Sequence, residues 1–242
     1  ILFSDIRSFT TLSEGMTPEE NFNFLNAYLK NVGPAIRECS GFIDKYIGDA
    51  VMALFPHSAS DAVRAALAMR RELAGFNKKR MDDNLPAIGI GIGIHTGMMM
   101  LGTIGEEERM ESTVISDSVN LASRLEGLTK QFGAPLIISE HTLQKLGTYT
   151  ESLCIRPLGR VYVKGKKASV SIFEIIDQES DERAEEKIET LDMFTTAVRL
   201  FAKGNHGDAD VIFRDIEKKC PNDRAVTMYR KIITGKEKMD FD

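Results

Sequence analysis

Residues 42–55, FIDKYIGDAVMALF, hold two apolar stretches on either side of Gly48-Asp49. Glycine and aspartate are common turn residues, and the flanking stretches favour strands, so we predict a β-hairpin here. Residues 1–6, ILFSDI, indicate another short buried strand. Asp5 and Asp49 therefore each stand at the edge of an apolar strand, where a carboxylate is costly unless a cation neutralises it. If the strands pair, the two aspartates converge and can share two divalent ions.

A third element supports this functional interpretation, because Asp49 alone is more simply explained as a turn residue. Apolar residues at helical spacing in residues 117–128 predict a core-facing stripe, made of Val119, Ala122, Leu125 and Leu128. Asn120 and Arg124 are four residues apart and share a different face of the same helix. An amide and a guanidinium aimed together near a helix start suit a polyanionic ligand.

Length and composition are typical of a soluble enzyme. The 242 residues can form one large domain, or one domain with a small appendage, and the net charge of −5 implies no nucleic-acid partner. The 3 cysteines are far apart and lack metal-site spacing, which favours a reducing compartment. No apolar run approaches the ~18 residues of a membrane helix. We expect a cytoplasmic domain whose missing upstream sequence could hold a sensor or membrane segment.

Helices and strands alternate along residues 1–177. Thr17-Pro18-Glu19-Glu20 indicates a helix start with a capping box, and the helix should place Phe22, Leu25, Leu29 and Val32 on its core face. A second helix over residues 60–80 should bury Ala62, Ala66, Met69 and Leu73. Residues 88–94 alternate isoleucine with glycine, which predicts a strand that a helix or a second subunit approaches closely. Residues 98–101 should continue this apolar strand, and further short strands are predicted at 113–115, 136–139, 161–163 and 170–176.

The composition changes after Asp177, where a charged run begins. Residues 178–242 then predict a linker and two or three short helices, interrupted at Gly204-Asn205 and again at Pro221-Asn222. The pattern resembles a single tetratricopeptide-like unit, but one occurrence is no array. A helical appendage packed on the core is the interpretation we favour.

Five segments in order resemble the signatures of class III nucleotidyl cyclases. They are residues 3–10, FSDIRSFT; 45–49, KYIGD; 91–97, GIGIHTG; 119–124, VNLASR; and 163–166, VKGK. The resemblance covers residues 1–177 and implies an α+β fold, the ferredoxin-like cyclase core with a mixed sheet and helices on its faces, followed by the small helical segment. Ser8 and Ser116 stand where the family often has glycine. With serine at position 116, the sequence does not decide the geometry of the turn into the following helix.

The resemblance implies an adenylate cyclase that converts ATP to 3′,5′-cyclic AMP and pyrophosphate for intracellular signalling. Two divalent ions per site, Mg²⁺ or Mn²⁺, would be held by Asp5, Asp49 and the backbone carbonyl of Ile6. Arg124 would stabilise charge on the α-phosphoryl group, and Asn120 would orient the ribose. Lys164 would bind phosphate oxygens, although Lys166 competes for that role.

The choice of base and the assembly also follow from the resemblance. Lys45 and Thr113 match the purine-reading positions; an ammonium donor and a hydroxyl acceptor suit adenine, whereas guanine presents the reverse pattern. A salt bridge of Lys45 with Asp44 or Asp49 is the simpler alternative for that residue. The active form would be a homodimer with composite sites, in which one subunit supplies the aspartates and the other supplies Lys45, Thr113, Asn120, Arg124 and Lys164. The rival hypotheses are a guanylyl cyclase and a catalytically silent module that only binds nucleotide or a partner.

Overall fold

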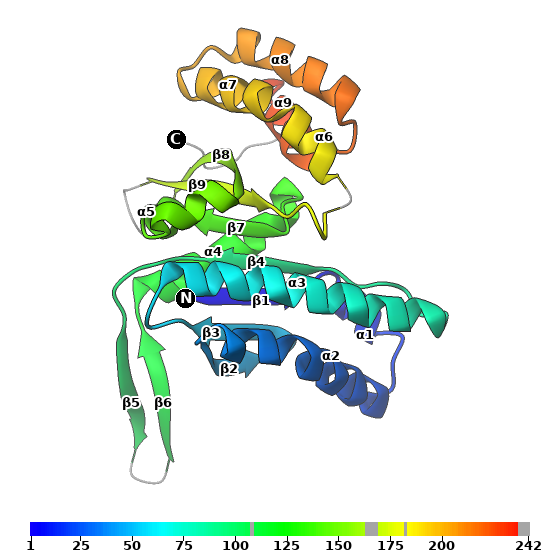
Figure 1. Cartoon of the computed structure of the whole chain (residues 1–242), viewed down its shortest axis with the longest axis vertical. Helices are drawn as coiled ribbons and strands as arrows, with labels where there is room; N and C mark the ends of the chain where they lie inside the picture. The colour runs from blue at the N-terminus through cyan, green and yellow to red at the C-terminus, as the bar shows by residue number, and fades with distance from the viewer. Residues whose placement is uncertain (107–108, 163–168, 182, 237–242) are drawn as a thin grey trace. The chain divides into compact units, whose positions relative to one another are not determined.

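The computed structural model describes residues 1–106, 109–162, 169–181 and 183–236 (Figure 1). The chain forms two compact units, Ile1–Glu126 and Gly127–Asp242. This division differs from the boundary predicted after residue 177, which stays a prediction. The α+β class is confirmed, because each unit combines strands with helices.

The first unit contains strands in the order β2-β3-β1-β4: β2 (Phe42–Ile47), β3 (Ala50–Leu54), β1 (Leu2–Ile6) and β4 (Ile90–Ile94). All three neighbouring pairs are antiparallel. The predicted hairpin is present, since β2 and β3 pair around a turn in which Gly48 has a φ of 64°. Left-handed backbone of this kind favours glycine because it has no Cβ. The hairpin thus places Asp49 at the start of β3.

Helix α2 (Pro18–Glu38) begins at the predicted capping box. The Glu20 backbone N–H donates to Thr17 Oγ1 at 3.3 Å, and the Thr17 N–H donates to Glu20 Oε2 at 2.7 Å. The predicted core face is displaced, because Phe22 is 70% exposed while Phe24, Tyr28 and Val32 are buried. The buried residues recur every four positions, and this periodicity assigns Phe22 to the solvent side.

Helix α3 (Ala59–Asp82) packs against α2, and the two lie side by side in Figure 1. The core residues predicted for this helix are all buried: Ala62, Ala66, Met69 and Leu73. A short helix, α1 (Phe9–Ser13), connects β1 to α2. The helices of this layer therefore follow the periodicity of the sequence, apart from the rotation of α2.

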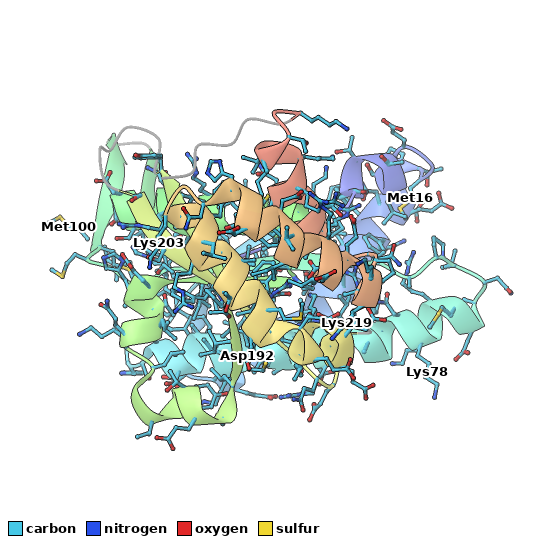
Figure 2. All side chains as sticks on the ribbon, turned by 90° about the horizontal axis from the view of Figure 1, so that it is seen from above. Met16, Lys78, Met100, Asp192, Lys203 and Lys219 are labelled. Atoms are coloured by element: carbon cyan, nitrogen blue, oxygen red, sulfur yellow. The ribbon has the colours of Figure 1, made fainter. Side chains whose placement is uncertain are left out.

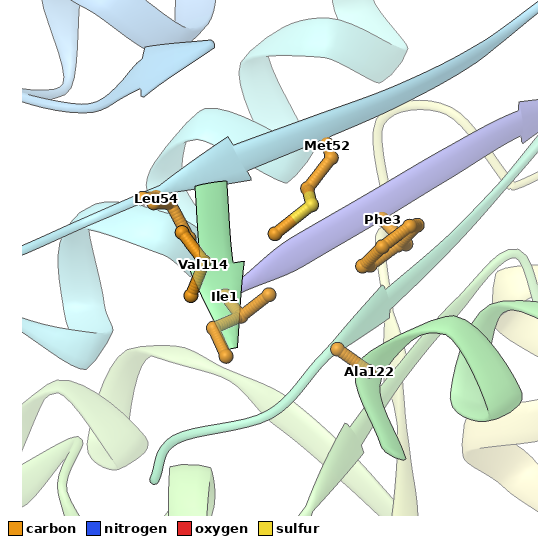
Figure 3. Packing of buried hydrophobic residues seen from close by; sticks show 6 residues of the cluster. All are labelled: Ile1, Phe3, Met52, Leu54, Val114 and Ala122. Atoms are coloured by element: carbon orange, nitrogen blue, oxygen red, sulfur yellow. The ribbon is translucent and has the colours of Figure 1, made fainter. Parts of the chain in front are cut away.

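Helix α4 (Asp117–Phe132) is seated on β4 at a glycine. A Cβ on Gly93 would lie 2.2 Å from the Glu126 backbone nitrogen and 2.6 Å from the Ala122 carbonyl oxygen. No larger residue fits there without moving the helix, which confirms that the glycine alternation permits close approach by a helix. Beside this contact a buried cluster joins the strands to α4 (Figure 3); its members are Ile1, Phe3, Met52, Leu54, Val114 and Ala122.

A two-stranded arm completes the first unit. Strands β5 (Met100–Glu106) and β6 (Arg109–Ile115) pair antiparallel, from Met100 opposite Ile115 to Glu106 opposite Arg109. We predicted that residues 98–101 continue an apolar strand, yet Met98 is 91% exposed and Met100 is 75% exposed. The side chain of Met100 projects outward in Figure 2.

The second unit contains an antiparallel sheet in the order β7-β9-β8: β7 (Leu136–Ser139), β9 (Ser169–Ile176) and β8 (Cys154–Tyr162). Helix α5 (Glu140–Gln144) and a 3₁₀ helix (Gly147–Ser152) connect β7 to β8. Four helices follow among the described residues: α6 (Ala184–Glu189), α7 (Leu191–Ala202), α8 (His206–Lys219) and α9 (Arg224–Ile233). The predicted helical segment is therefore present, while its tetratricopeptide likeness stays a prediction.

A buried set of charges, which we call the tail ion network, joins these helices to β8 and β9. Its members are Arg156, Glu174, Asp181, Lys187 and Asp223. Arg156 pairs with Glu174 at 3.3 Å and with Asp223, and Lys187 pairs with Glu174 and, at 2.9 Å, with Asp181. The Arg156 guanidinium also lies 3.5 Å from the centroid of the Phe194 ring. Each buried charge thus has a partner of opposite sign.

The outer face of the tail is polar. Asp192, Lys203 and Lys219 are exposed and are labelled on α7, on the turn after it and on α8 in Figure 2. On the inner side Tyr229 is fully buried, and its hydroxyl donates to the Leu158 carbonyl at 2.8 Å. Within the described part of the chain, no helix combines the length and apolar character needed to cross a bilayer.

Candidate active site

The two predicted aspartates come together at one end of β1. Strand β1 pairs with β3, and the Ile6 N–H donates to Asp49 Oδ2 at 3.2 Å. Asp5 and Asp49 also interact directly, through a hydrogen bond between their carboxyl groups. The hairpin turn therefore carries Asp49 back to the strand that bears Asp5.

The environment of Asp49 disfavours its negative charge. The pKa of Asp49 is raised to about 6, chiefly by burial and in addition by the hydrogen bond and the negative charge of Asp5. Backbone N–H groups of Asp49 and Ile6 act in the opposite direction. Two carboxylates in contact, partly removed from water, are stabilised when a cation binds between them.

The donor set at this point fits a hard divalent cation. Mg²⁺ and Mn²⁺ prefer oxygen ligands, and Mg²⁺ is usually bound by one or two carboxylates together with substrate phosphates. Asp5 and Asp49 supply the carboxylates, and the Ile6 carbonyl is the third ligand implied by the sequence. Among the described residues no group of three or more His, Cys, Asp or Glu side chains forms a metal site. Two carboxylates alone would leave coordination positions for a nucleotide.

Lys45 lies on the same face of the sheet as Asp5. Strand β2 has a β-bulge between Ile43 and Lys45, so that Lys45 stands opposite Met52. Met52 in turn stands opposite Phe3, and residues 3 and 5 of a strand point to the same face. The predicted alternative for this lysine is also present, since its Nζ lies 3.4 Å from Asp44 Oδ2. Its side chain is 38% exposed.

Asn120 and Arg124 occupy one side of α4, where Asn120 is exposed and Arg124 is half-buried. The opposite side of the helix is buried, as predicted, at Ala122, Leu125 and Leu128. The helix start is well formed despite Ser116, because the Ser118 N–H donates to Ser116 Oγ at 3.0 Å. The serine that departs from the family pattern therefore caps the helix that carries both residues.

The described part of the chain shows no polar contact between these two residues and the aspartates of the same chain. Neither Asn120 nor Arg124 forms a hydrogen bond or ion pair with Asp5 or Asp49 there.

Two further predicted residues are placed only in part or not at all. Thr113 belongs to β6, opposite Gly102, and its side chain lies outside what the structure describes. Lys164 and the competing Lys166 fall in residues 163–168, also outside the described residues. Their predicted roles stay predictions.

Tyr28 is a buried polar residue near the aspartates that sequence reasoning did not single out. It is fully buried on α2, and burial raises the pKa of its hydroxyl above its ordinary range. The negative charges of Asp49 and Asp5 raise this pKa further, which places the hydroxyl within their electrostatic reach. In the sequence, Tyr28 stands four residues from both Phe24 and Val32. This spacing predicts burial, but it does not distinguish Tyr28 from an ordinary core residue.

A cavity of about 660 Å³ also lies in the first unit, between α1, α2 and α3. Phe24, Phe76 and Arg80 are among the residues that line it, and none of its lining residues is a predicted site residue. The Arg80 guanidinium lies 5.0 Å from the Phe24 ring centroid and donates through Nε to the Pro86 carbonyl at 2.9 Å. The cavity is therefore separate from the aspartate pair.

Residues 1–177 match the family described as the adenylate and guanylate cyclase catalytic domain. An adenylate cyclase of Anabaena cylindrica is 49% identical over 181 residues, covering 72% of this chain and 36% of that protein. The terminal-differentiation-specific adenylate cyclase of Dictyostelium discoideum is 37% identical over 239 residues, 95% of this chain and 11% of that protein. The chain thus spans about a third or less of the length of these relatives, and the second match extends into the helical tail.

Solved structures give the same fold. The adenylyl cyclase CyaB from P. aeruginosa has a TM-score of 0.63 at 31% identity, over 73% of this chain and 92% of that chain. The guanylyl cyclase Cya2 has a TM-score of 0.63 at 33% identity, over 75% of this chain and 91% of that chain. The predicted fold, a cyclase core with a helical C-terminal segment, is confirmed, and proteins named for either purine resemble it equally well.

Proposed function

Since this chain belongs to the adenylate and guanylate cyclase catalytic-domain family, we propose that it is an adenylate cyclase, converting ATP to 3′,5′-cyclic AMP and pyrophosphate for intracellular signalling. The observation that carries the proposal is the closeness of Asp5 and Asp49 in a partly buried place; burial, together with the hydrogen bond and charge of Asp5, raises the pKa of Asp49 to about 6. Two carboxylates held together in this way form an electrostatic site for divalent cations and the nucleotide that accompanies them. If the two aspartates had only a structural role, a positively charged side chain of the same chain would be expected beside them.

The reaction forms a bond between the ribose 3′-oxygen and the α-phosphorus and breaks the bond to pyrophosphate. Two bound Mg²⁺ or Mn²⁺ ions would supply acidification of the 3′-hydroxyl and neutralisation of the triphosphate. Asp5 and Asp49 would hold those ions together with the Ile6 carbonyl. Arg124 stabilises the charge that develops on the α-phosphoryl group, and Asn120 orients the ribose. Lys164 or Lys166 binds phosphate oxygens.

Adenine is the proposed base because of Lys45 and Thr113. A lysine ammonium donates to a ring nitrogen of adenine, and a threonine oxygen accepts from the 6-amino group. Lys45 stands on the same face of the sheet as Asp5 and contacts Asp44 in its own chain. Guanine presents an N1–H donor where Lys45 offers only donors, so GTP should be the poorer substrate.

The proposed active form is a homodimer with two composite sites. Asp5 and Asp49 of one subunit would face Lys45, Thr113, Asn120, Arg124 and Lys164 of the other. Within the described residues, Asn120 and Arg124 make no hydrogen bond or ion pair with Asp5 or Asp49 of the same chain, which fits sites completed by a second copy. Apolar side chains that a partner could cover are exposed at Phe42, Tyr46 and Ile47 on β2, and at Met98, Met100 and Leu101. We propose a cytoplasmic location and further domains upstream.

One assay tests the reaction and the base together. Purified chain is given ATP or GTP separately with Mg²⁺ or Mn²⁺, and the products are separated by chromatography. We expect cyclic AMP and pyrophosphate in equal amounts from ATP, and much less cyclic GMP from GTP. A folded dimer that makes neither product is a silent binding module, and preferential cyclic GMP formation would reverse the assignment of Lys45 and Thr113.

The base-reading residues have a sharper test in the double variant Lys45→Glu, Thr113→Cys. Because it reverses the hydrogen-bond pattern offered to the purine, the ratio of ATP to GTP turnover should fall by about tenfold or more. A folded double variant with an unchanged ratio would show that these residues do not read the base.

A further inference from the structure

An ion pair connects the strand that bears Asp5 with the helix that bears Arg124. Arg7 follows Asp5 by two residues, and its Nη1 donates to Glu126 Oε1 at 2.9 Å. Glu126 follows Arg124 by two residues on α4. The side chains are only 27% and 13% exposed, so the bond is largely protected from water. We call this contact the strand–helix bridge.

The bridge closes a rigid three-element unit. The Arg7 N–H donates to the Gly89 carbonyl at 2.8 Å, and Asp5 stands opposite Gly91 on the neighbouring β4. Strand β4 then receives α4 at Gly93, where a Cβ would lie 2.2 Å from the Glu126 nitrogen. Glu126 is therefore held twice, by backbone contact with β4 and by its carboxylate on Arg7.

The bridge also lies within reach of the Asp5 charge. Burial raises the pKa of Glu126, Arg7 lowers it, and Asp5 raises it. Arg7 has a second buried terminal nitrogen, Nη2, with no partner among the described residues. Loss of the Glu126 carboxylate would thus leave a partly buried guanidinium with both ends unpaired, close to the aspartates.

We propose that Arg7 and Glu126 are positioning residues that fix α4, and with it Asn120 and Arg124, relative to the Asp5 strand. The inference rests on the proposed function and deepens it. In the proposed homodimer the aspartates of a chain serve one site and its α4 serves the other. The strand–helix bridge therefore connects the two active sites of a dimer through each subunit.

The first test is a double-mutant cycle in the full chain. Arg7→Gln and Glu126→Gln should each lower kcat by about tenfold or more at saturating ATP and Mn²⁺, because small displacements of positioning groups are costly. The double variant should lose no more than the worse single variant, since both break one contact. Arg7→Lys, which keeps the charge, should recover most of the activity.

A matched control and a binding measurement complete this test. Arg214→Gln breaks a tail ion pair with Asp210 on a side chain that is 57% exposed, and it should leave kcat unchanged. Mn²⁺ binding to nucleotide-free protein, followed by electron paramagnetic resonance, should weaken severalfold in Arg7→Gln and stay normal in Arg214→Gln. Losses that multiply in the double variant, or a folded Glu126→Gln with normal kcat, would overturn the proposal.

The second test asks whether the bridge connects two sites. A mixed dimer of an Asp5→Ala chain and an Arg124→Ala chain has one intact composite site. Glu126→Gln in the Asp5→Ala chain disturbs the α4 of that site and should lower kcat, leaving the Mn²⁺ requirement unchanged. The same change in the Arg124→Ala chain disturbs its aspartate strand and should raise the Mn²⁺ concentration needed for half-maximal activity.

The outcomes separate the two proposals. Identical losses from both placements would show that Glu126 only maintains the fold, and would overturn the coupling. If differently tagged chains form mixed dimers that stay inactive before Glu126 is changed, the composite site itself is wrong. In that case the double-mutant cycle still decides whether Arg7 and Glu126 position α4 within one chain.

Discussion

Two clusters of charged side chains in this molecule, one buried and one partly buried, are built on opposite principles. In the tail ion network every charged side chain has a partner of opposite sign, and Arg156, Glu174 and Lys187 are almost fully buried. In the aspartate pair of the first unit, two like charges lie together and the pKa of Asp49 is raised to about 6. The compensated cluster fastens helices to strands. In the aspartate pair, the repulsion between the two carboxylates is relieved when a cation and a substrate bind.

The largest expected effect is on chemistry at the uncompensated cluster. Asp5→Asn or Asp49→Asn should remove nearly all cyclase turnover, a loss of about 3 kcal/mol or more of transition-state stabilisation. Circular dichroism should show an intact fold, because neither substitution changes side-chain volume greatly. Turnover is measured at saturating Mn²⁺ so that weaker metal binding cannot mask the result. Substantial activity in either variant would remove that aspartate from the site.

The next effect is on stability at the compensated cluster. Arg156→Met leaves Asp223 buried without its cation and Glu174 with Lys187 alone, which should lower the free energy of unfolding by about 3–5 kcal/mol. Urea unfolding of the full chain measures the change. The matched control is Arg214→Gln, because the Arg214 side chain is 57% exposed and Asp210 keeps its second partner Arg230, so this ion pair is worth about 0–1 kcal/mol. Equal midpoints for the two variants would show that the tail ion network does not stabilise the chain.

A smaller effect on stability, an increase instead of a decrease, is expected for Asp49→Asn in metal-free protein. The folded-state pKa of Asp49 is raised, so the protonated form is favoured on folding, and this contribution is lost as the pH rises from 3.8 through about 6. Above pH 6 the variant should therefore be more stable than the wild type, by at most about 1 kcal/mol because the group is partly exposed. Below pH 4 the difference should vanish. A destabilised variant at pH 7.5 would contradict the like-charge account.

The smallest expected effect is on the activity of a fragment that lacks the tail. Residues 1–178 retain Asp5, Asp49, Asn120 and Arg124, so kcat in a folded, dimeric fragment should stay within about threefold of the full chain. The fragment loses Lys187 and the rest of the tail, and should be less soluble and unfold at lower temperature. Size-exclusion chromatography establishes the dimer before the assay. An inactive but folded dimer would make the tail part of the active machinery.

Local signals predicted the first unit well. The hairpin at Gly48-Asp49, the capping box at Thr17 and the glycine that seats α4 each depend on a few adjacent residues, and each is present. The predicted buried face of α2 was wrong at Phe22, because Phe22 is as apolar as its neighbours and only packing decides which face of the helix is buried. The exposure of Met98 was missed for the same reason, since apolar character alone does not reveal a surface left for a partner.

Long-range contacts were beyond the sequence. Arg156 and Asp223 are 67 residues apart, and Arg7 and Glu126 are 119 residues apart. Nothing in the spacing of such residues tells an ion pair from two solvated charges. The aspartate pair was predictable because each member belongs to a local motif, and a resemblance that joined the motifs supplied the convergence. The roles of Thr113 and Lys164 depend on that resemblance alone.

The β-bulge between Ile43 and Lys45 has a consequence for how such a domain could change its substrate. The bulge fixes, by backbone geometry, the face to which position 45 points, whatever side chain stands there. The backbone at the bulge thus sets the direction of the side chain at position 45, whereas the residue type at that position sets its chemistry. Under the proposed base reading, a mutation at position 45 would alter which purine is accepted without reorienting the strand, whereas deleting one residue nearby would change the direction of every side chain beyond it. Substitutions at position 45 would therefore disturb the strand little, whereas insertions or deletions nearby would disturb it strongly.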